Sequence, residues 1–253
     1  MRVFGDLLVR ARELGRAIGD GVVDSGHAAL YVRQLLRGNR AAPSIRRPRY
    51  AASDTPVLLL HGYLATRGSV HLLEQRLTES GHVVMTYRLG PVQMGDIRAS
   101  SGFIARKVDS LCQQTGVEKV DIVAHSMGGL VALDYLKRLN GHERVRRLIM
   151  LGTPVHGTWS ALMSLMTAPL GHAAVQLLPG SAFLRELAAR PMPAGPEVTV
   201  VSAERDWLAP PSTTELSGAR RFQVPTGHSG LLVDERVAVL VSDLLRGDAP
   251  QPT

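Results

Sequence analysis

Short apolar runs alternate with helix-like segments from residue 55 onward, and this alternation restricts the possible folds of the chain most strongly. Each run has the length and composition of a strand that is buried on both faces. The expected strands are residues 56–60, 82–87, 119–124, 145–151, 197–203 and 220–224. The expected helices are residues 69–80, 98–115, 127–140 and 231–246. The pattern predicts an α/β domain with a minimal, mostly parallel sheet of about six strands flanked by helices.

The first 54 residues differ from this domain in charge. Residues 1–49 hold ten arginines and four acidic residues, whereas the rest of the chain is close to neutral. Helical spacing of apolar residues predicts helices over 3–18 and 21–37, and the second has an apolar side with Val22, Val23, Ala29, Leu30, Val32, Leu35 and Leu36. We therefore expect a basic helical extension with its linker over 1–54, and the α/β domain over 55–248.

Two interpretations of this extension stay open. The helices can pack on the domain with their arginines in solvent, or residues 1–37 can lie peripherally on an anionic membrane. Nucleic-acid binding is not expected, because the arginines lack interleaved aromatic residues and acids interrupt them. Neither a signal peptide nor a spanning segment is evident, so we expect a cytoplasmic protein, either free or peripheral on a membrane.

The segment between the fourth and fifth expected strands is unusually long. Residues 155–196 form an apolar, amphipathic insert where one short helix would suffice. The insert is either a pair of helices packed on the sheet or a helical cap over a ligand pocket at the strand ends.

A serine with small neighbours follows the third expected strand. The sequence there is Ala124-His125-Ser126-Met127-Gly128-Gly129, directly before an expected helix. A serine in a sharp strand-to-helix turn is the arrangement of a nucleophile elbow, in which small flanking residues avoid collisions with the neighbouring backbone. Ser126 is therefore the candidate nucleophile.

A nucleophilic serine needs a base and an acid, which follow it in the order acid then histidine in this kind of fold. His228 comes after the last expected strand and is the candidate base. The fifth expected strand is followed by Glu204 and Asp206, of which Asp206 is preferred because the turn must first clear the sheet. Its role would be to hold the histidine tautomer and stabilise the imidazolium.

Two backbone N–H groups would stabilise a developing oxyanion. Met127 supplies one, because it follows the serine at the start of a helix. The turn at His61-Gly62 after the first strand supplies the other, from Tyr63 or, failing that, from Leu64. No metal or cofactor signature is present, and the single cysteine, Cys112, is expected to be an inert thiol.

Together these motifs resemble the α/β-hydrolase superfamily, and within it the bacterial lipase/esterase group that includes proteins like GPI inositol-deacylase. The resemblance covers residues 55–246. The sequence departs from the family pattern at Ala124, where most members have glycine. It implies a serine hydrolase that cleaves carboxylic esters, with a bias toward lipid or other apolar acyl esters suggested by the insert. A thioesterase, an acyltransferase and a noncatalytic binding protein of this fold remain alternatives.

Overall fold

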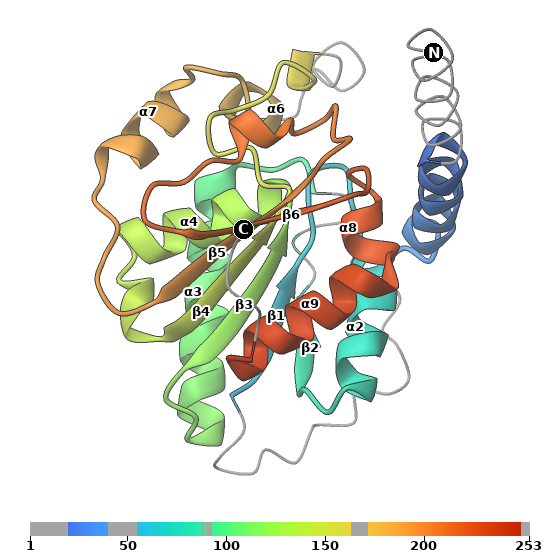
Figure 1. The fold of residues 1–253 in the computed structure, drawn as a ribbon. Coiled ribbons are helices and arrows are strands. Elements are labelled where there is room, and N and C mark those ends of the chain that lie inside the picture. Colours follow the sequence, from blue (N-terminus) through green and yellow to red (C-terminus); the bar gives the residue numbers. More distant parts are fainter. Residues whose placement is uncertain (1–19, 40–54, 88, 90–92, 163–171, 249–253) are drawn as a thin grey trace, which may run out of the picture.

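The sheet of the protein is built from six parallel strands in the order β2-β1-β3-β4-β5-β6 (Figure 1). The computed structural model describes residues 20–39, 55–87, 89, 93–162 and 172–248. The strands are β1 (Val57–Leu60), β2 (Val84–Thr86), β3 (Val120–His125), β4 (Val145–Leu151), β5 (Glu197–Ala203) and β6 (Arg220–Val224). All six expected strands are confirmed, and every pairing is parallel.

The helices of the described chain follow the expected pattern with one break. They are α2 (His71–Glu79), α3 (Ile97–Thr115), α4 (Met127–Arg138), α6 (His172–Gln176), α7 (Ala182–Ala189), α8 (Gly230–Val233) and α9 (Glu235–Arg246). Short 3₁₀ turns lie at Arg67–Val70, Gly141–Glu143 and Pro211–Thr213. The single helix expected over 231–246 is divided at Asp234, whose extended backbone and side-chain bond to the Arg236 N–H start a new helix.

The helices cover both faces of the sheet, and each face has its own apolar core. Along β1, Leu58 and Leu60 point into the core beneath α3 and α4, whereas Val57 and Leu59 point into the core beneath α2, α8 and α9. This alternation follows from the two-residue period of a strand. It explains the continuous apolar run of β1, which is typical of a parallel strand buried on both sides.

The insert between β4 and β5 packs largely on the domain. Helix α6 contacts α3, and α7 contacts α4. Its residues Phe183, Leu184 and Leu187 are buried in the same core as those two helices. Helices α6 and α7 therefore pack on the domain, while Ala161 and Leu177 of the same insert line a cavity at the strand ends, so the insert takes part in both arrangements. Residues 163–171, the middle of the expected cap, lie outside the described residues.

A helix over residues 20–35 lies against the domain near α8 (Figure 1). The side facing the domain carries Asp24, His27, Tyr31 and Gln34, which recur at helical spacing and are all at least partly buried. Most of the apolar side expected over 21–37 is exposed instead: Val22 is 68%, Val32 50% and Leu36 80% exposed. The polar side packs inward because the domain supplies charged and hydrogen-bonding partners for it. The expected helix 3–18 and nearly all of the linker lie outside the described residues.

Among the described residues, no helix has both the length and the apolar character that crossing a membrane requires.

Candidate active site

The carboxyl ends of four parallel strands bring the candidate residues to one edge of the sheet. The loop after β1 carries His61 to Leu64, and Ser126 follows β3 directly. Asp206 and His228 lie in the loops after β5 and β6. Because all strands are parallel, these loops meet at the same edge, where ligands bind in open α/β sheets.

Ser126 lies in a strained turn between β3 and α4. Its backbone angles are φ 53° and ψ −129°, outside the regions that L-residues usually adopt. The turn is held by the Ser126 N–H, which donates to the Leu151 oxygen at 2.8 Å. This strained geometry agrees with the nucleophile elbow expected from the sequence.

Close packing explains the small residues around the turn. A Cβ added to Gly128 would lie 2.8 Å from the backbone oxygens of both Leu60 and His61. A Cβ added to Gly62 would lie 2.9 Å from the Cβ of Ser126. Ala124, which stands where most members of the family have glycine, is completely buried within β3. The turn therefore accepts alanine two residues before the serine but has no room for a side chain two residues after it.

His228 and Asp206 form a buried hydrogen-bonded pair. His228 Nδ1 lies 2.6 Å from Asp206 Oδ2, and the two side chains are 11% and 0% exposed. The other carboxylate oxygen accepts hydrogen bonds from the backbone N–H groups of Leu208, at 3.0 Å, and Ala209, at 2.7 Å. An ionised carboxylate only accepts, so Nδ1 carries the proton and Nε2 is left as an acceptor. Glu204, the alternative acid, is exposed.

Ser126 and His228 line the same cavity, which has a volume of about 190 Å³. Tyr31, Leu177 and Leu208 form part of its wall. Among the hydrogen bonds of the described residues, none joins Ser126 Oγ to His228. Catalytic hydrogen bonds are often long in structures without substrate and shorten when a ligand binds.

The loop after β1 offers two alternative oxyanion donors, the N–H groups of Tyr63 and Leu64, which differ in their hydrogen bonds. The backbone N–H of Leu64 donates to the Gln93 oxygen at 2.9 Å, so this N–H is occupied. Within the described part of the chain, the N–H groups of Tyr63 and Met127 donate to no protein acceptor. Tyr63 also lines the cavity together with Ser126. The geometry thus favours Tyr63 over Leu64 as the partner of Met127.

Two further histidines are buried beside the site as neutral imidazoles. Burial, together with the nearby His228, lowers the pKa of His125 well below its usual value. Burial likewise lowers the pKa of His61 to about 4. Neither ring therefore adds a positive charge to the site near pH 7.

Several residues of the site were not found by sequence reasoning. Gly152 lies against the acid–base pair: a Cβ there would be 3.2 Å from both Asp206 Oδ2 and His228 Nδ1. Gln93, completely buried, holds the loop of Tyr63 and Leu64. Tyr31 comes from the N-terminal helix, and only the fold brings it to the cavity. Gly152 belongs to the motif Leu151-Gly152-Thr153-Pro154, one of the features that carry the resemblance, but no role was expected for this glycine.

The described residues include no cluster of His, Cys, Asp and Glu side chains that could hold a metal ion. Cys112 is buried in α3, and burial raises the pKa of its thiol. A high thiol pKa disfavours the reactive thiolate, in agreement with an inert cysteine.

Residues 55–189 match the family described as alpha/beta hydrolase fold. The chain belongs to this family. The match includes Ser126 and the loop of Tyr63, whereas Asp206 and His228 lie beyond its end.

Similar solved structures include lipases and esterases. Lipase B of Aspergillus fumigatus has a TM-score of 0.68 at 18% identity, over 84% of this chain and 56% of the lipase. Lipase BlEst2 of Bacillus licheniformis in its propeptide form has a TM-score of 0.67 at 15% identity, over 85% of this chain and 54% of the other. A thermophilic esterase of Thermogutta terrifontis has a TM-score of 0.50 at 19% identity, over 78% and 91% of the two chains.

At such identities the likeness concerns the fold alone. The chain spans a little over half the length of the two lipases. The inositol-deacylase resemblance has no support among these comparisons.

Proposed function

We propose that the protein is a serine hydrolase that cleaves carboxylic esters of lipids or other apolar acyl groups. The proposed nucleophile is Ser126, the base is His228 and the acid is Asp206. The observation that carries the proposal is the 2.6 Å bond between His228 Nδ1 and Asp206 Oδ2, at the strand edge where Ser126 occupies its strained turn. The lipase and esterase names of the similar structures agree with it.

The reaction would follow from the protonation states of these groups. His228 Nε2 accepts the hydroxyl proton while Ser126 Oγ attacks the acyl carbonyl. Asp206 holds the Nδ1 proton and stabilises the imidazolium that forms. The N–H groups of Tyr63 and Met127 donate to the carbonyl oxygen as it becomes negative. His228 then protonates the leaving alcohol. In the second half of the reaction, His228 accepts a proton from water, the water attacks the acyl group, and His228 returns the proton to Ser126 Oγ as the acid leaves.

The apolar character of the cavity supports the proposed substrate class. Leu177, Leu208 and Ala161 line it beside Ser126. An acyl chain in such a wall gains about 0.8 kcal/mol for each buried methylene. The cavity, at about 190 Å³, is smaller than the roughly 300–1,000 Å³ of pockets for drug-sized ligands. This size favours an acyl chain of short or medium length.

Two measurements test the proposal. A fluorophosphonate probe should label the wild-type protein at Ser126 and should leave the Ser126→Ala variant unlabelled. A series of p-nitrophenyl esters of increasing acyl length should then be hydrolysed by the wild type alone. Absence of both labelling and turnover would support the alternative of a noncatalytic binding protein.

Thioesters and acyl acceptors other than water use the same groups, so a thioesterase or an acyltransferase remains the second candidate. To separate a thioesterase, an ester and the matching acyl thioester are compared for how well each protects Ser126 from the fluorophosphonate probe. Transfer of the acyl group to an added alcohol, measured against hydrolysis, separates the second.

A peripheral position on an anionic membrane is part of the proposal. Val22 and Val32 are exposed on the helix over 20–35, and Leu36 is exposed in the turn that follows it. Arg33 and Arg37 are exposed beside them. Apolar residues next to basic ones suit the surface of anionic lipid. The full-length protein should sediment with phosphatidylserine vesicles and less so at high salt. Val32→Ser with Leu36→Ser should weaken this binding while ester hydrolysis in solution is unchanged.

A further inference from the structure

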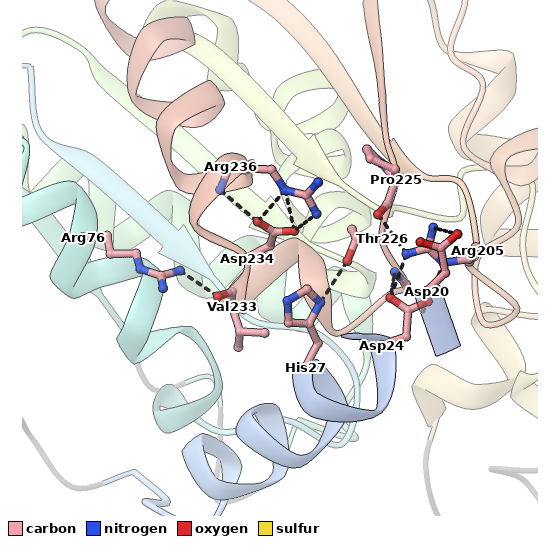
Figure 2. Close-up of polar contacts among 11 residues, drawn as sticks. Asp20, Asp24, His27, Arg76, Arg205, Pro225, Thr226, Val233, Asp234 and Arg236 are labelled. Atoms are coloured by element: carbon pink, nitrogen blue, oxygen red, sulfur yellow. Dashed lines mark hydrogen bonds and ion pairs between the residues drawn. The ribbon is translucent and has the colours of Figure 1, made fainter. Parts of the chain in front are cut away.

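The N-terminal helix over residues 20–35 contacts three loops of the proposed active site. Near its start, Asp24 and His27 contact the loops after β5 and β6 (Figure 2). Near its end, the Leu35 oxygen accepts a hydrogen bond from Thr66 Oγ1 at 3.1 Å. Thr66 belongs to the loop after β1 that also holds Tyr63. Between these two ends, Tyr31 reaches the cavity wall beside Ser126.

Asp24 makes the strongest of these contacts. Its carboxylate accepts two hydrogen bonds from the Arg205 guanidinium, from Nε at 2.6 Å and from Nη2 at 3.1 Å. The same carboxylate accepts the backbone N–H of Gly227 at 3.1 Å. The bond to Arg205 lowers the pKa of Asp24, so the carboxylate is ionised near pH 7. Bidentate pairs of this kind fix geometry as well as adding energy.

The positions of these two partners give the contacts their meaning. Arg205 immediately precedes Asp206, and Gly227 immediately precedes His228. One carboxylate therefore binds the residues that lead into both the proposed acid and the proposed base. Arg205 also links the two loops directly. Its backbone N–H donates to the Thr226 oxygen at 3.1 Å, and its side-chain Nη2 donates to the Pro225 oxygen at 2.8 Å.

We propose that Asp24 is a positioning residue, which holds the loops of Asp206 and His228 in the register that their hydrogen bond requires. The helix over 20–35 is then a working part of the active site rather than an appendage. Asp24 contacts neither the substrate nor the reacting atoms, so it acts through His228 and Asp206. The inference rests on the proposed function and adds to it a residue that lies before the α/β domain in the sequence.

The test compares Asp24→Asn with Asp20→Asn. Asp20 lies one turn earlier on the same helix and also pairs with Arg205, at 3.5 Å, but has no contact with Gly227 among the described residues. If the hydrogen bond of a charged group holds the catalytic residues in place, its loss corresponds to roughly 10- to 100-fold in rate. Asp24→Asn should lower kcat by this factor with KM changed less than twofold, and Asp20→Asn should stay within twofold of wild type.

A purely structural role predicts a different result. In that case Asp24→Asn would lower Tm and leave kcat at 25 °C unchanged, and this outcome would overturn the proposal. Asp24→Glu, which keeps the charge, should recover part of the lost rate. Arg205→Met removes the pair with Asp24 and the Nη2 bond to the Pro225 oxygen, so its kcat should also fall although the Gly227 N–H stays bonded to Asp24.

A second readout does not depend on ester hydrolysis. NMR of the His228 imidazole reports the proton on Nδ1 and its bond to Asp206. Asp24→Asn should shift this resonance or broaden it, whereas Asp20→Asn should not. If no ester is cleaved but the resonance responds, the proposed function fails and the positioning role stands. If wild type is active and neither kcat nor the resonance responds to Asp24→Asn, the positioning role fails alone.

Discussion

The imidazole rings of His125 and His228 lie against each other, with centroids 4.5 Å apart and planes inclined by 50°. His125 Nε2 also lies 3.3 Å from the backbone oxygen of His228, and a carbonyl oxygen only accepts, so this nitrogen donates. His125 therefore contacts the proposed base through its ring and through its Nε2–H.

Replacing His125 with Phe keeps an aromatic ring but removes the donor to the His228 oxygen. We expect kcat to fall by about tenfold, the effect of one ordinary hydrogen bond on geometry. His125→Gln, which can restore a donor, should lie closer to wild type. Steady-state kinetics on one p-nitrophenyl ester measures both, and equal loss in the two variants would mean that ring volume matters more than the hydrogen bond.

Asp206→Asn should lower kcat by about 10⁴-fold, because an amide no longer fixes the Nδ1 proton of His228. Glu204→Gln should have little effect, since Glu204 is exposed and makes no side-chain contact with His228 among the described residues. Circular dichroism checks that both variants fold. A large loss in Glu204→Gln with a small loss in Asp206→Asn would reverse the assignment.

Folding stability should depend on pH through His61. Its pKa is about 4 in the folded protein and about 6.5 in an unfolded chain, so the unfolded state binds more protons between these values. Stability therefore falls as pH decreases from about 6.5 to 4, by about 3 kcal/mol from this residue.

Urea unfolding at a series of pH values measures this effect. His61→Gln should lose its part of the decline, so that variant and wild type differ less at pH 4 than at pH 7. A part of the decline should persist in the variant, because burial also lowers the pKa of His125. Parallel curves for the two proteins would show that the pKa of His61 is the same in the folded and the unfolded state.

The cavity wall predicts a dependence on acyl length. Ala161 is 3% exposed and lines the cavity, so Ala161→Leu should fill part of the space for the acyl chain. Hydrolysis of an octanoate ester should fall about tenfold more than that of an acetate ester, the equivalent of about two methylenes. Ala189→Leu, at an exposed position of α7, is the matched control. An equal loss on both esters would place the acyl chain elsewhere.

The strands could be predicted from the sequence because most are short apolar runs that alternate with helix-like segments; β6, with the sequence RRFQV, is the exception and buries only Phe222 fully. The places of Ser126, Asp206 and His228 after β3, β5 and β6 follow from the same parallel order. Asp234 was missed as a helix boundary because the apolar spacing continues through it.

The side of the N-terminal helix that packs could not be predicted, since apolar spacing points to the wrong one. Val22 and Leu36 are exposed, and Asp24 finds its partners only in the folded chain. An ion pair between residues so distant in sequence leaves no local pattern. The same reason explains why Tyr31 could not be assigned to the cavity.

The contacts of Asp24 also set the order in which the protein can become competent during synthesis. Asp24 and its partners Arg205 and Gly227 are separated by 181 and 203 positions along the chain. At a translation rate of 5–20 residues per second, the helix waits roughly 10–40 s before its docking loops exist. Until then its polar face is solvated and the sheet assembles without it. Docking therefore joins a segment made early to loops made late, and on the proposed function a ribosome-bound nascent chain that lacks β6 should show a partial sheet and no ester hydrolysis.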